Sequence, residues 1–219
     1  MTLQQTWNEY CKAFGVKQDI IDKYWSEIES KYTEKQRYYH TLNHLTHMFT
    51  LFDDVKDELS RPELVAMAIF FHDIEYEPTE KDNEEKSAVL FKEFSTNFEA
   101  QDAEPQKDSA LVFDWIIETK KHETEVHRTP EIFGRDDLHF FLDMDMAILG
   151  VSDSDYKKYA DEIRQEYIHI PDQLFKQGRA KVLRSFLKVP NIYATEIFRN
   201  KFEKQARENI EAEIRRLEE

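Results

Sequence analysis

Histidines are concentrated in one stretch of this chain, since four of its eight histidines lie between residues 40 and 72. His40, His44 and His47 are spaced i, i+4 and i+7, which places their side chains on one face of a helix. Helical spacing of this kind can point several imidazoles at one metal ion. The alternative is a polar helix edge with ordinary histidines.

An imidazole and a carboxylate directly follow the most apolar run of the chain, residues 64–71. We therefore expect His72 and Asp73 near the core, where a charge is costly unless it is paired or bound to a metal. Adjacent imidazole and carboxylate groups suit a divalent metal. A helix cap or a structural salt bridge is the alternative.

Asp145 is the third candidate ligand, because a helical wheel puts it in the middle of the apolar face of residues 138–149. Asp143 is predicted to point away from that face. A carboxylate among apolar neighbours needs a partner, and a metal ion or a buried arginine would supply one.

His122 ends a second helical face, which begins at Asp108 and runs through Trp115 and Thr119. This placement makes His122 a candidate inward-facing histidine. We expect structural roles for the other histidines after residue 72, which are His127, His139 and His169.

The elements that must position these residues are predicted to be helices. Apolar residues recur at helical spacing nearly throughout, and four glycines and six prolines are too few for an all-β chain of 219 residues. Residues 60–63 resemble a capping box, Asp82 is expected to cap a helix through Phe98, and the last helix is expected from about Asn191. We predict an all-α fold of eight or more helices in a single domain over residues 1–219, with a core at about residues 35–150 and flanking helices at both ends.

Composition excludes several classes of function. The net charge of −15 argues against a general nucleic-acid or anionic-membrane binder, although a local pocket could hold one phosphate. The longest apolar run is too short to cross a membrane, and the first residues do not resemble a signal peptide. With the single cysteine Cys11, no intrachain disulfide can form, and we expect a cytoplasmic location. A homo-oligomer is compatible with the sequence.

Four ordered segments together resemble the HD-domain superfamily of metal-dependent phosphohydrolases. They are Arg37–His44, Phe70–Ile74, Asp82–Ala88 and Asp143–Gly150, and they look like a bacterial branch known mainly as predicted HD phosphohydrolases. The resemblance covers about residues 5–215. It implies an HD-domain-like helical bundle.

The resemblance also implies a ligand set for one divalent ion: His44, His72, Asp73 and Asp145. His44 is favoured over His40 because it begins the family's His-aliphatic-x-x-hydrophobic pattern. Mn, Fe, Co, Ni, Zn and Mg all remain candidates for such a site. The sequence offers too few histidines for a full second ion site, although His122 could partly support one.

The remaining site residues are assigned by the same resemblance and by their chemistry. Asp73, Glu84 and His122 are expected in catalysis, and Arg37, His40 and Lys120 in substrate binding. The alternative for Glu84 is a first-turn glutamate that favours the helix dipole. Arg37 and Lys120 could equally be solvated surface residues.

These residues predict an enzyme, a metal-dependent phosphohydrolase. It would act as a phosphomonoesterase or phosphodiesterase on a nucleotide or another small phosphorylated metabolite. Two alternatives remain open: a di-iron oxygenase of the HD type, and a non-catalytic module that binds a metal or a nucleotide.

Overall fold

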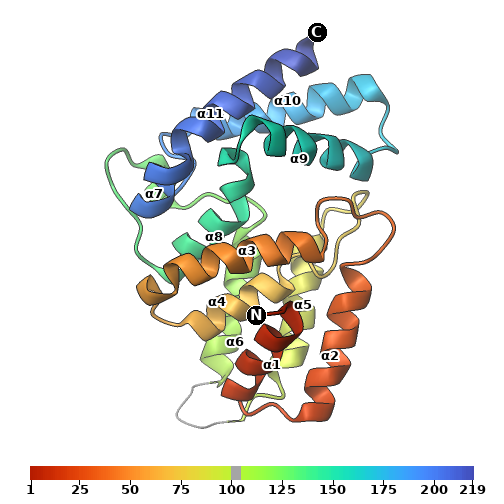
Figure 1. Ribbon diagram of the computed structural model, residues 1–219, viewed down its shortest axis with the longest axis vertical. Helices are drawn as coiled ribbons and strands as arrows, with labels where there is room; N and C mark the ends of the chain where they lie inside the picture. Colours follow the sequence, from red (N-terminus) through yellow and green to blue (C-terminus); the bar gives the residue numbers. More distant parts are fainter. Residues whose placement is uncertain (100–104) are drawn as a thin grey trace. The chain divides into compact units, whose positions relative to one another are not determined.

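The computed structural model describes residues 1–99 and 105–219, and these residues are mainly helical (Figure 1). They form eleven α-helices and two 3-10 helices and contain no strand, apart from an isolated bridge that pairs Gly134 with Thr195. The predicted all-α fold with eight or more helices is confirmed.

The chain divides into two compact units, residues 1–121 and residues 122–219. The boundary falls inside the segment 35–150 that the sequence suggested as the core, and the single domain stays a prediction. Among the described residues, no helix combines the length and the apolar composition that a membrane crossing requires.

The first unit contains six α-helices and one 3-10 helix. They are α1 (Leu3–Ala13), α2 (Gln18–Lys31), α3 (Leu42–Val55), η1 (Lys56–Glu58), α4 (Pro62–Phe71), α5 (Asn83–Ser95) and α6 (Pro105–Glu118). Helix α4 lies at the centre of this unit, where it contacts α1, α3, α5 and α6 (Figure 1). Every residue from Leu64 to Phe71 is fully buried, as its uniformly apolar sequence predicts.

The start of α4 differs from the predicted capping box. Arg61, not Ser60, occupies the N-cap position, and its side chain makes no cap hydrogen bond. The Arg61 guanidinium instead donates to both carboxylate oxygens of Asp108 in α6, at 3.1 and 2.9 Å. Helix α5 likewise begins after Asp82 without a bond from that side chain, and it ends at Ser95 rather than Phe98.

The second unit contains five α-helices and one 3-10 helix. They are α7 (Glu125–Arg128), α8 (Asp137–Met146), η2 (Ala147–Gly150), α9 (Asp153–Glu166), α10 (Asp172–Lys188) and α11 (Glu196–Glu218). Helix α11 packs against η2 and α10. It begins at Glu196, later than predicted, because Thr195 caps it.

Candidate metal centre

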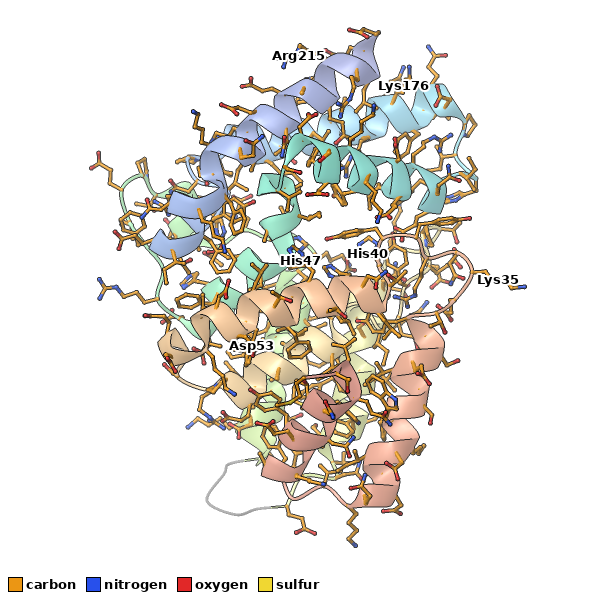
Figure 2. All side chains as sticks on the ribbon, viewed as in Figure 1. Lys35, His40, His47, Asp53, Lys176 and Arg215 are labelled. Atoms are coloured by element: carbon orange, nitrogen blue, oxygen red, sulfur yellow. The ribbon has the colours of Figure 1, made fainter. Side chains whose placement is uncertain are left out.

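His44 lies in the first turn of α3, where it is 3% exposed. The hydroxyl of Thr41 caps this helix by accepting a hydrogen bond from the backbone N–H of Asn43, so α3 begins at Leu42. His40 therefore precedes the helix, and the predicted three-histidine helical face is wrong for that residue. His47 lies further along α3, as Figure 2 shows with both histidines labelled.

His72 follows the last residue of α4 and is 1% exposed. Its Nδ1 atom lies 2.9 Å from the carbonyl oxygen of Ile69. A carbonyl can only accept, so Nδ1 carries the proton and the neutral ring has its lone pair on Nε2. The end of α4 thus fixes the tautomer that a metal ligand needs.

Lone pairs of three side chains in the first unit converge on a small volume. The Nε2 atoms of His44 and His72 lie 3.1 Å apart, and His72 Nε2 also lies 3.1 Å from the Oδ2 atom of Asp73. Two nitrogens bound to one ion at about 2.1 Å are expected to lie roughly 3.0–3.4 Å apart. A single proton can bridge only some of these atoms, whereas a divalent cation satisfies all three. His44 and His72 belong to a group of side chains that could hold a metal ion.

His40 lies beside the Asp73 carboxylate and near the ring of His44, with the two ring centroids 5.9 Å apart. Its Nε2 atom is 3.8 Å from Asp73 Oδ2, and its ring stacks on the ring of Tyr76 with the centroids 4.2 Å apart. His40 thus borders the cluster. Tyr76 was not predicted as part of the site, because no local pattern links it to a histidine 36 residues earlier.

In the second unit, α8 carries the two aspartates that the helical wheel distinguished. Asp145 is half-buried, with a side chain 12% exposed, and its Oδ2 atom lies 2.7 Å from Nε2 of His122. The structure therefore gives Asp145 a histidine partner within the second unit, and its role as a ligand stays a prediction.

Asp143, which the helical wheel placed off the apolar face, is also buried, because a distant segment covers it. Its carboxylate accepts hydrogen bonds from the backbone N–H of Ala194 at 2.7 Å and from the N–H and hydroxyl of Thr195 at 2.8 and 2.7 Å. Burial raises the pKa of Asp143 to about 7, against these hydrogen bonds, which act to lower it. Asp143 thus anchors the segment before α11.

His122 lies in a turn, not in a helix as predicted, because α6 ends at Glu118. Its φ of 51° falls in the left-handed region, which non-glycine residues rarely adopt. The structure brings together two of the predicted site residues in this unit, His122 and Asp145.

Arg37 does not have the exposed guanidinium expected of a phosphate-binding residue. Its side chain is fully enclosed and donates to the carbonyl oxygens of His40, Asp73 and Ile74. Enclosure argues against the predicted phosphate contact.

Lys120 and Glu84 lie near each other beside the start of α5, with 3.9 Å between Nζ and the carboxylate. Lys120 donates to the carboxylate of Glu85 at 2.5 Å and to the carbonyl oxygen of Lys81 at 2.9 Å. The ammonium group of Lys120 is therefore engaged with α5, and the catalytic role of Glu84 stays a prediction.

His127 and His139 have structural roles, as expected. Each occupies the third position of its helix and accepts, at Nδ1, the backbone N–H of the N-cap residue, Thr124 at 2.9 Å and Asp136 at 3.2 Å. Burial lowers the pKa of His127 to about 4 and lowers that of His139. Both rings are thus neutral caps.

Comparison of the chain with family models, with curated proteins and with solved structures found no match. The resemblance to the HD-domain superfamily therefore stays a prediction.

Proposed function

We propose that this protein is a metal-dependent phosphohydrolase whose ion is bound by His44, His72, Asp73 and Asp145. The observation that supports it most directly is the convergence of His44 Nε2, His72 Nε2 and Asp73 Oδ2 within 3.1 Å contacts. The second unit would contribute Asp145, as the resemblance implies.

The residues present fit a divalent ion. Two neutral imidazoles and two carboxylates form an N2O2 donor set, which Mn, Fe, Co, Ni, Zn and, less well, Mg accept. A bound ion would lower the pKa of its water and offset the charge of a phosphoryl group. The carbonyl of Ile69 keeps the proton of His72 on Nδ1, so Nε2 remains available as a ligand.

Neighbouring side chains have separate roles in this proposal. His122 orients the carboxylate of Asp145 through the 2.7 Å contact. His40, whose ring rests on Tyr76, borders Asp73 and is the residue we assign to the substrate's phosphate. Glu84 is proposed as a proton acceptor, and a small phosphorylated metabolite or nucleotide as the substrate.

A screen of the metal-reconstituted chain against phosphomonoesters and phosphodiesters, with a nucleotide panel, tests the proposal. His72→Ala is the matched control, because it removes a ligand and leaves the rest of the site. Turnover that needs both metal and His72 supports a phosphohydrolase.

Other outcomes point to the alternatives. Two irons per chain with dioxygen consumption would indicate an oxygenase. Stoichiometric metal with no turnover of any phosphate ester would indicate a binding module.

A further inference from the structure

The guanidinium of Arg37 is buried between the two segments that carry the candidate metal ligands of the first unit. Arg37 lies in the connection between α2 and α3, and its side chain has no exposed surface. It lies against the rings of Tyr32 and Tyr76, with the guanidinium carbon 4.9 and 5.3 Å from their centroids.

One edge of this guanidinium binds the turn that follows α4. Nη1 donates to the carbonyl oxygen of Asp73 at 2.7 Å, and Nη2 donates to that of Ile74 at 2.8 Å. Carbonyls just beyond a helix end have no partner within the helix. The two terminal nitrogens of the planar guanidinium supply hydrogen bonds to two such carbonyls at once. The backbone of a candidate ligand, Asp73, is thereby fixed directly.

The Nη1 atom of Arg37 also reaches the segment that leads into α3. Nη1 donates to the carbonyl oxygen of His40 at 3.2 Å, one residue before the cap Thr41 and four before His44. Arg37 therefore joins two segments that are more than thirty residues apart in the sequence. These are the segments from which the lone pairs of His44, His72 and Asp73 converge.

A buried charge in this position is costly unless it is paired and hydrogen-bonded. Glu34 supplies the counter-charge, with its Oε2 atom 3.3 Å from Nε of Arg37. A lysine could not replace this arrangement, because its donors radiate from one nitrogen and lack the planar fork.

We propose that Arg37 is a positioning residue of the metal centre, which holds the His44 segment and the His72–Asp73 turn at the spacing that one ion requires. This inference rests on the proposed metal site. It also reassigns Arg37 from the substrate to the backbone that supports the ligands.

Titration with Co²⁺, followed by its visible absorption, tests the proposal on the full chain. We expect Arg37→Lys to raise the Co²⁺ dissociation constant by about tenfold or more, the size of effect that outer-shell partners of metal ligands show. Glu34→Gln is the milder variant, since it loosens one edge of the guanidinium at a partly exposed position, and a rise of a few fold is expected.

Arg207→Lys is the matched control. Arg207 pairs with Glu203 and donates to the carbonyl oxygens of Val189 and Pro190, so it too joins a carboxylate and a backbone segment, in the second unit. Its replacement should lower the unfolding temperature and leave Co²⁺ affinity within about twofold. A merely structural Arg37 would behave in the same way as Arg207.

Hydrogen exchange of the metal-free chains separates this inference from the proposed function. Arg37→Lys should speed exchange at residues 40–44 and at residues 72–76 together, and Arg207→Lys should not. Unchanged Co²⁺ affinity in both Arg37→Lys and Glu34→Gln, or in Glu34→Gln alone if Arg37→Lys does not fold, would overturn the proposal. If the wild-type chain binds no Co²⁺, the metal site itself is wrong, and hydrogen exchange alone decides whether Arg37 joins the two segments.

Discussion

The Nε2 atoms of His44 and His72 lie 3.1 Å apart, although the two residues are separated by 28 positions and lie on different helices. His72 holds its proton on Nδ1, so at least one of the facing nitrogens presents a lone pair. A divalent cation placed between them would be coordinated by both nitrogens.

We expect His72→Ala and Asp73→Ala each to abolish bound metal without unfolding the chain. The apolar residues of α4 and the helices around it hold the first unit together, and these remain in place. Elemental analysis measures the metal, and thermal unfolding measures the fold. Loss of the cooperative transition in either variant would indicate a structural ion instead.

Asp145→Asn and Asp143→Asn should separate metal binding from folding. An amide is a weaker ligand than a carboxylate, so Asp145→Asn is expected to lose most of the bound metal. Asp143→Asn should keep metal but lower the free energy of unfolding by about 2 kcal/mol, because an amide NH2 group replaces one of the two oxygens that accept hydrogen bonds from Ala194 and Thr195.

Elemental analysis and denaturant unfolding of both variants distinguish these outcomes. If Asp143→Asn empties the site and Asp145→Asn does not, the assignment of the two aspartates is reversed.

Local patterns in the sequence were sufficient to predict the position of an element where burial of apolar residues decides it. An uninterrupted apolar run such as residues 64–71 can only be satisfied at the centre of a fold, and α4 lies there in the first unit. The ionisable residues His72 and Asp73, which follow this run, accordingly lie at the end of α4, next to the core.

Partners distant in the sequence explain what local patterns did not predict. The wheel treated one face of α8 as the buried face, but Asp143 is buried by a segment 51 residues later. Arg37 looked like a surface cation because its carbonyl acceptors lie 36 and 37 residues away. The residue type of an arginine does not reveal which backbone carbonyls its guanidinium will donate to.

The close approach of η2 and α11 can be tested by two glycine substitutions. A Cβ at Gly150 would lie 2.5 Å from Cβ of Phe202 and 2.8 Å from its carbonyl oxygen, so Gly150→Ala should destabilise the second unit by about 1–3 kcal/mol. Gly178→Ala in α10 meets no atom within 4 Å and should stabilise by about 0.5–1 kcal/mol. Equal effects from the two substitutions in chemical denaturation would contradict this packing.

The neutral cap at His127 predicts a pH dependence of stability. The pKa of His127 is about 4 in the folded chain, because burial disfavours the imidazolium, against about 6.5 in an unfolded chain. Between these values the unfolded chain binds more protons, so the contribution of His127 is fully present above pH 6.5 and is lost as the pH falls toward 4. This contribution to the free energy of unfolding amounts to roughly 3 kcal/mol.

Urea unfolding of the wild type and of His127→Gln, at steps from pH 4 to pH 7.5, measures the contribution of His127. The wild type should lose more stability on acidification than the variant. Parallel plots of stability against pH for the two chains would show that the pKa of His127 does not differ between the folded and unfolded states.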